Sequence, residues 1–300
     1  MVKKKLEDMN LIDNFLIQAI SSDQEVNEAS LRCILEVLLE RKIGKIRVVS
    51  EKIVPGYSPE HRGIRMDVEI TEMDANELET VTNVFDMEPH IGKDKDFPRA
   101  NRFRQAKIDS RYMKSGDNDF IHLPDLYVIT ITNYDIFGEG QMIYTFREKC
   151  VEVPDLPYEN GLYHIYFNTT GTKGGSKSIK NMLHFMENSN STAAVDEATK
   201  ELDGYVRKVK MDPEVRRELM TFGDIIDRER DEAKIEDRVE SIIDLLCELG
   251  EVSPELEARI NAQNNMDCLK KLHKIAARVD SIEEFIEQMD EVLKDNMVSA

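Results

Sequence analysis

The sequence predicts an α/β fold followed by an all-helical C-terminal region. Apolar and polar residues alternate with a period of two in 64–71 and 81–90, which is typical of strands with one buried face. Apolar residues instead recur at helical spacing in 9–20 and 24–41. Beyond residue 196 the patterns are those of charged helices up to the end of the chain.

The elements are expected in the following order. The helix 9–20 precedes the helix 24–41, whose buried side should hold four residues: Leu31, Ile34, Leu35 and Leu38. Three strands, a helix that begins after Asp96, and three further strands should follow; the expected strands are 46–53, 64–71, 81–90, 126–132, 142–146 and 163–168. Two later helices should begin at the caps Ser253 and Ser281.

Three regions are expected along the 300 residues. Residues 1–188 are long enough to bury a sizeable core and contain all the predicted strands. Serine and asparagine are concentrated just after this core, so 189–196 is interpreted as a linker. The helical region then spans 197–300, and such a region is more often an assembly or packing element than a catalytic one.

Four carboxylates fall on one face of the predicted hairpin. Asp67 and Glu69 alternate along its first strand, and Asp86 and Glu88 along its second. Like charges opposite one another destabilise a strand pair. Either the face is solvated, or the carboxylates hold a divalent metal ion such as Mg²⁺. The pattern leaves both explanations open, and the loop 72–79 is too long to fix the register.

A series of motifs in a fixed order bears on the choice between a solvated face and a metal site. Asp67 is followed after about twenty residues by Glu88-x-His90, and then by the helix 102–109. Further blocks follow at 126–132, 134–138, 143–146, 167–171 and 216–220. In this order they resemble the PD-(D/E)XK nuclease family transposases, also called recombination-promoting nucleases.

The resemblance implies a restriction-endonuclease-like mixed sheet flanked by helices. It also implies Mg²⁺-dependent or Mn²⁺-dependent hydrolysis of DNA phosphodiesters during mobile-element recombination. The implied metal ligands are Asp67, Glu88 and the carbonyl of Pro89, and the other implied catalytic residues are His90 and Gln105. The implied nucleic-acid contacts come from the basic helix: Arg102, Arg104, Lys107 and Arg111.

Three positions depart from the family's pattern. His90 replaces a lysine or glutamine, Pro89 lacks a backbone donor, and Arg104 stands where the family usually has tyrosine. A neutral imidazole can still accept a proton from water. A second interpretation therefore stays open, in which a catalytically degenerate nuclease-fold module binds DNA or a protein partner.

The charge distribution bears on the partner. The net charge of −19 argues against a general nucleic-acid coat, and 221–300 alone holds 21 acidic and 10 basic residues. In 93–114, by contrast, eight basic residues face three acidic ones. Such a strip is compatible with weak, salt-sensitive phosphate contact and equally with an ordinary solvated helix. The resemblance implies that DNA contacts it, although nothing in the residues separates DNA from RNA. The helical region is the expected site of self-association.

Other classes of protein are not supported. No apolar run approaches the roughly 20 residues that a membrane span requires, and the N-terminus does not continue into a secretory signal. The expected protein is therefore cytoplasmic, without a membrane partner. The four cysteines are far apart and form no C-x-x-C pair, so neither structural zinc nor a disulfide framework is expected.

Overall fold

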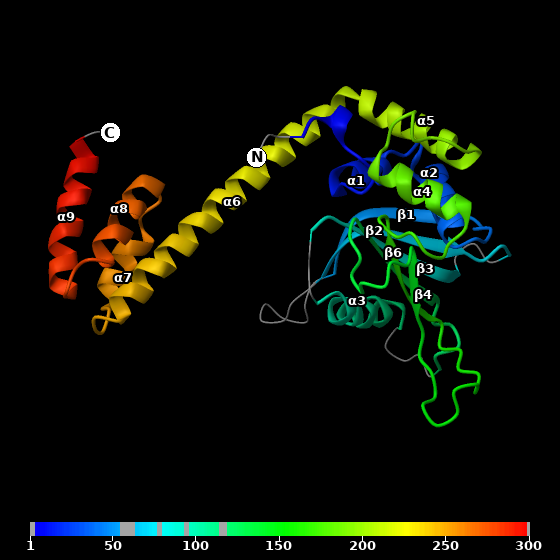
Figure 1. The fold of residues 1–300 in the computed structure, drawn as a ribbon, viewed down its shortest axis with the longest axis horizontal. Coiled ribbons are helices and arrows are strands. Elements are labelled where there is room, and N and C mark those ends of the chain that lie inside the picture. The colour runs from blue at the N-terminus through cyan, green and yellow to red at the C-terminus, as the bar shows by residue number, and fades with distance from the viewer. Residues whose placement is uncertain (1–3, 55–63, 77–79, 93–95, 114–118, 299–300) are drawn as a thin grey trace. The chain divides into compact units, whose positions relative to one another are not determined.

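The computed structural model describes residues 4–54, 64–76, 80–92, 96–113 and 119–298 (Figure 1). The description of side chains leaves out 51–54, 64–67, 222–233 and 295–298 as well. The chain divides into two compact units, Met1–Leu219 and Met220–Ala300. Within the described ranges, every helix is too short or too polar to cross a membrane.

A six-stranded mixed sheet forms the centre of the first unit (Figure 1). The strands are β1 (Ile46–Val54), β2 (Ile64–Met73), β3 (Val81–His90), β4 (Asp125–Thr132), β5 (Ile143–Phe146) and β6 (Leu162–Asn168). They lie in the order β1-β2-β3-β4-β6-β5, with the first three antiparallel, β3, β4 and β6 parallel, and β5 antiparallel at the edge. The predicted α/β class with a mixed sheet is confirmed.

Four helices cover one face of this sheet (Figure 1). They are α1 (Asn14–Ser22), α2 (Asn27–Leu38), α4 (Lys177–Glu187) and α5 (Glu197–Met211), and a short 3-10 helix, Leu6–Asp8, precedes them. α1 and α2 pack against β1, while α4 and α5 pack against α2. The buried side of α2 is made of Leu31, Ile34, Leu35 and Leu38, as predicted. This layer contains most of the apolar core, because the opposite face of the central strands is largely polar.

Helix α3 (Phe97–Tyr112) lies on the other face of the sheet (Figure 1). Its Ile108 is fully buried and packs with Val84 of β3 and with Leu126 and Val128 of β4. α3 therefore covers the face on which β2 and β3 carry their polar residues. The candidate site lies between this helix and the sheet.

The segment predicted to be a linker packs within the first unit. Ser189 is 3% exposed, its hydroxyl accepts the backbone N–H of Leu11 at 2.8 Å, and Ala193 is buried. α5, which follows this segment, packs on α1, α2 and α4. The division between the two units therefore lies at Leu219 and Met220 rather than at 189–196. The small polar residues of this segment form hydrogen-bonded turns over the first helices.

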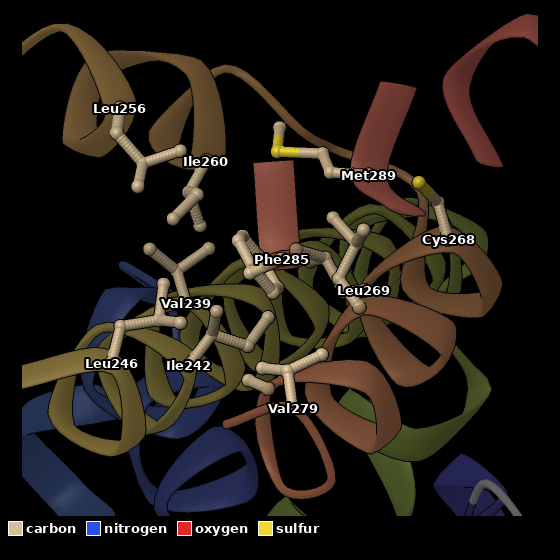
Figure 2. Close-up of a cluster of buried hydrophobic side chains, with 12 residues drawn as sticks. Val239, Ile242, Leu246, Leu256, Ile260, Cys268, Leu269, Val279, Phe285 and Met289 are labelled. Carbon is tan, nitrogen blue, oxygen red and sulfur yellow. The ribbon is translucent and has the colours of Figure 1, made fainter. Parts of the chain in front are cut away.

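The second unit is helical, as predicted. α6 (Pro213–Cys247) continues into it from the first unit, and α7 (Pro254–Asn261), α8 (Met266–Ala276) and α9 (Ile282–Val298) complete it. Figure 2 shows Phe285 of α9 among aliphatic side chains of the other three helices. The predicted caps are present: the hydroxyls of Ser253 and Ser281 each accept a backbone N–H at 3.2 Å. The unit therefore has its own apolar core.

Candidate functional site

The strand register brings the acidic residues of β2 and β3 together. Glu69 lies opposite Asp86, and the last pair of the ladder is Val68 with Met87. Asp67 precedes Val68 on β2, and Glu88 follows Met87 on β3, so both positions adjoin the end of this ladder. Asp67 is within β2, but its side chain lies outside the described residues. The structure therefore gives the register between β2 and β3, which could not be predicted from the sequence.

The acidic face is buried under α3. The exposed fractions are 1% for Glu69, 0% for Asp86 and 8% for Glu88. The solvated-face explanation is therefore wrong for these three residues. Burying a carboxylate is costly unless positive charge and hydrogen bonds compensate for its lost hydration. That compensation comes from arginines of α3.

Arg111 neutralises Glu69. Its two terminal nitrogens donate to the two carboxylate oxygens of Glu69 at 2.6 and 2.8 Å, a bidentate arrangement. Burial disfavours the charged guanidinium, but the hydrogen bonds and charge of Glu69 outweigh it and raise the pKa of Arg111. Burial also raises the pKa of the neighbouring Tyr112 hydroxyl. This end of α3 is therefore tied to β2 by a charged clamp.

Arg104 contacts the two acidic residues of β3. Its Nη1 donates to Glu88 Oε1 at 2.5 Å and lies 3.8 Å from Asp86 Oδ2. Asp86 and Glu88 are two residues apart on one strand, so their side chains point to the same face. One guanidinium thus stands against both carboxylates. Glu88 is the member of the pair nearer the end of β3.

The end of β3 holds the other two residues of the predicted motif. Pro89 is buried and lies opposite Ile131 of β4, while the ladder with β2 has already ended at Met87. The residue without an N–H donor thus stands where the pairing with β2 has stopped. His90 is half-buried, and its ring meets the Phe97 ring edge-on with centroids 4.8 Å apart. Both residues are at the rim of the acidic face.

The predicted residues of α3 do not share one surface. Gln105 is half-buried and donates to Asp109 Oδ2 at 3.4 Å, and burial raises the pKa of Asp109. Arg102 is exposed. Lys107 is only 7% exposed, and its ammonium lies 5.6 Å from the centroid of the Phe103 ring. Of the predicted nucleic-acid contacts, Arg102 alone is exposed to solvent, whereas Arg104 and Arg111 point to the carboxylates.

A polar cluster beside Glu88 was missed from the sequence. Asn101 of α3 donates to the hydroxyls of Thr130 at 3.0 Å and Tyr166 at 3.1 Å, and all three residues are buried. Burial raises the pKa of the Tyr166 hydroxyl. Thr130 is the register partner of Glu88. Thr130, a polar residue between Ile129 and Ile131 of β4, is a signal that could have indicated this cluster.

Among the described side chains, the carboxylate of Glu88 is the one that belongs to the metal ligands implied by the sequence resemblance. Mg²⁺ takes one or two carboxylates and completes its shell with water and substrate oxygens. Glu88 offers such oxygens and already receives the positive charge of Arg104, which stands where a cation would be attracted. Within the described part of the chain no cluster of three His, Cys, Asp or Glu side chains could hold a metal ion. The Asp67 side chain is outside that part, and a two-carboxylate site needs no such cluster.

Comparison with known proteins gives no relative. The chain matches no protein-family model, no curated protein and no solved structure.

Proposed function

We propose that this protein is a Mg²⁺-dependent DNA endonuclease with a restriction-endonuclease-like core. The observation that carries the proposal is the buried row of carboxylates Glu69, Asp86 and Glu88, which ends beside the last pair of the β2–β3 ladder. The order of helix, three antiparallel strands, helix α3 and parallel strand β4 also agrees with the core that the sequence resemblance implies. The proposed setting is mobile-element recombination.

The proposed cation would be held by Asp67, Glu88 and the carbonyl of Pro89. When bound, Mg²⁺ or Mn²⁺ would polarise the scissile phosphodiester and lower the pKa of the attacking water. The protein's own contribution is to position that water and the phosphate. His90, at the rim, offers an imidazole nitrogen as proton acceptor.

DNA would approach along α3. Arg102 projects from the helix into solvent, and it can contact a backbone phosphate. Arg104, Gln105 and Lys107 are less exposed than Arg102, and Arg104 contacts Glu88 at the proposed cleavage position. A guanidinium binds phosphate and carboxylate in the same forked geometry, so Arg104 suits either partner.

A second candidate function is a non-catalytic binding module. The observation that favours it is the ion pair of Arg104 with Glu88. In this ion pair the protein's own arginine neutralises the carboxylate that is expected to bind the metal. Such a module would bind DNA through the exposed part of α3. Alternatively it would bind a basic protein, or a second copy of itself, through the helical unit, where acidic residues outnumber basic ones by 21 to 10.

The experiment that separates the two is nicking of supercoiled plasmid by the purified protein in Mg²⁺ at low salt. Wild type is compared with Glu88→Gln, His90→Ala and Glu69→Gln. Glu69 is the matched control, because it is also buried but lies on the neighbouring strand β2 and is clamped by Arg111 of α3. Endonuclease function predicts nicking by wild type and Glu69→Gln and none by Glu88→Gln. Equal behaviour of wild type and Glu88→Gln would support the binding module instead.

A further inference from the structure

The segment that joins β5 to β6 is a long hairpin extension with defined internal contacts. We call residues 147–161 the arm, and Figure 1 shows it in green, projecting beyond the sheet. Arg147 forms an ion pair with Glu159 across the arm. Next to this pair, Asn160 Nδ2 donates to Glu148 Oε2 at 3.0 Å. Polar side chains therefore hold the two sides of the arm together near its base.

The apolar side chains of the arm face solvent instead. The N–H of Leu156 donates to the carbonyl of Val153 at 3.0 Å, which closes a turn with Pro154 in its second position. Phe146, the last residue of β5, is 46% exposed. On and beside the turn, four more apolar side chains are 52–86% exposed: Val151, Val153, Leu156 and Tyr158. Such a concentration of exposed apolar side chains marks an interaction surface.

The charge of the arm indicates the chemistry of its partner. The arm contains four acidic residues and two basic ones; the acidic residues are Glu148, Glu152, Asp155 and Glu159. Negative charge of this kind repels the phosphates of nucleic acids and of anionic lipids. The surface that fits the arm is therefore a protein surface that combines apolar side chains with positive charge.

The exposed side of α3 has this character. Arg99, Arg102 and Phe103 are exposed and lie three or four residues apart, so they share one side of the helix. Within the described ranges neither Arg99 nor Arg102 has an ion-pair partner. Because this side of α3 and the arm are both exposed in one chain, the arm does not cover the α3 of its own chain. A second copy can bring the two surfaces together.

We propose that the protein forms a two-fold symmetric dimer, in which the arm of each copy packs on the exposed side of α3 of the other copy. The apolar side chains of the arm cover Phe103, and the acidic Glu152 and Asp155 face the two arginines. This inference does not rest on the proposed endonuclease function. It places self-association in the first unit, whereas the sequence predicts it in the helical region. Arg102 is covered in such a dimer, so the dimer and a DNA complex exclude each other.

The exposed apolar area is sufficient for a dimer of this kind. Burying one apolar side chain fully removes on the order of 100 Å² of apolar surface from water. The five side chains of the patch are each 46–86% exposed, so one arm with Phe146 offers about 300 Å². Two arms and the two surfaces that they cover then bury about 1,200 Å², which is the lower end of the range for specific, stable interfaces. The contacts at the base of the arm fix its shape before binding, which lowers the entropic cost of association.

The test is sedimentation velocity of the full chain over a dilution series. Wild type should sediment as a dimer that dissociates on dilution. Val153→Asp/Leu156→Asp should raise the dissociation constant by about a hundredfold, because the apolar contacts are lost at both symmetric interfaces. The matched control is Val195→Asp, since Val195 is a 56% exposed apolar residue of the same unit outside the arm. The control should dimerise as wild type does.

A charge exchange identifies the surface that receives the arm. Arg99→Glu/Arg102→Glu and Glu152→Arg/Asp155→Arg should each weaken the dimer, because like charges then face each other. The combination of all four substitutions restores opposite charges and should restore the dimer. Association through apolar contact alone would not depend on the match of signs. The four side chains are exposed, so this measurement also serves if Val153→Asp/Leu156→Asp folds poorly.

Four results would overturn the inference. The first is a wild-type protein that stays monomeric at every concentration. The second is a dimer that Val153→Asp/Leu156→Asp leaves intact, which would place self-association elsewhere, for example in the helical unit. The third is equal weakening by the Val195→Asp control. The fourth is a charge-exchanged combination that does not recover the dimer.

Discussion

The clamp between Arg111 and Glu69 gives the sharpest prediction about stability. Arg111→Gln removes both short hydrogen bonds to Glu69 and leaves a carboxylate that is 1% exposed without its main counter-charge. The neighbour of Glu69 across the strands is Asp86, which is also acidic and fully buried. The substitution therefore increases repulsion within the face as well as removing attraction.

The size of the effect follows from the burial of the pair. Removing one partner of a buried ion pair costs about 3–5 kcal/mol. The Arg111 side chain is 21% exposed, so water partly screens the pair, and we expect the lower end of that range. The predicted loss in the free energy of unfolding is about 3 kcal/mol. Glu69→Gln leaves a guanidinium that can reach solvent, so it should cost less, about 1–2 kcal/mol.

Unfolding in urea, followed by tyrosine fluorescence, measures this loss of stability in the first compact unit. The chain has nine tyrosines and no tryptophan, and all nine precede Met220. The signal therefore reports the first unit alone, and Tyr112 stands next to Arg111 in it. Fitting the midpoint and slope of the transition gives the free energy of unfolding.

The double variant Arg111→Gln/Glu69→Gln decides whether the reasoning is right. It removes the buried charge that Arg111→Gln leaves behind, so it should be more stable than Arg111→Gln alone. A change within about 0.5 kcal/mol for Arg111→Gln would refute the account. A double variant less stable than Arg111→Gln would refute it as well.

Four further predictions test other parts of the structure. Asn101→Ala should lower the free energy of unfolding by about 2 kcal/mol in the same urea assay, because two buried hydroxyls lose their donor; an unchanged midpoint would contradict this. Burial alone would raise the pKa of Asp135, but hydrogen bonds from Tyr144 and three backbone N–H groups outweigh it and lower that pKa. The stabilisation is therefore present above the ordinary carboxyl pKa and is lost as pH falls through the lowered pKa. Asp135→Asn should lower the urea midpoint at neutral pH, and the difference from wild type should vanish in acid. A difference in midpoint that does not depend on pH would count against this prediction. Phe285→Ala should destabilise the second unit by about 3–5 kcal/mol. The destabilisation should appear as a lower temperature at which helical circular dichroism is lost, and an unchanged temperature would contradict the packing in Figure 2. Glu88→Gln should tighten binding of labelled duplex DNA without metal, because Arg104 is released toward phosphate, and Glu88→Gln/Arg104→Gln should abolish that gain; an equal affinity in both variants would argue against a phosphate role for Arg104.

The strands could be predicted from the sequence because their pattern is local. Alternation with a period of two marks β2 and β3 without reference to the rest of the chain. The register between them could not be predicted, since the connecting loop is long and the ladder shifts between Glu72 and Met73. The face-to-face position of Glu69 and Asp86 is therefore information that only the folded sheet contains.

The burial of the acidic face could not be predicted, because it depends on a helix far along the chain. α3 has one fully buried apolar residue, Ile108, so its sequence gives little indication of which side meets the sheet. The sequence resemblance implied nucleic-acid contacts for Arg104 and Arg111, whereas in the structure both contact the buried carboxylates. Charge complementarity with β2 and β3 decides the orientation, and it is a tertiary property.

The boundary between the units shows a similar limit. A run of serine and asparagine has the composition of a linker. In 189–196 those side chains cap turns instead, and Ser189 accepts from Leu11 and donates to Phe185. Short polar residues are suited both to linkers and to hydrogen-bonded turns, so composition alone cannot distinguish a linker from a packed segment. Packing of α5 on the first helices is what extends the first unit to Leu219.

The most direct test of the central claim is calorimetric titration of Mn²⁺ into wild type, Asp67→Asn and Glu88→Gln. If Asp67 on β2 and Glu88 on β3 hold the catalytic metal, wild type binds the ion and both variants lose that binding. If wild type shows no binding, or if Asp67→Asn and Glu88→Gln bind as wild type does, the acidic face is a charge-balanced structural element and not a metal site.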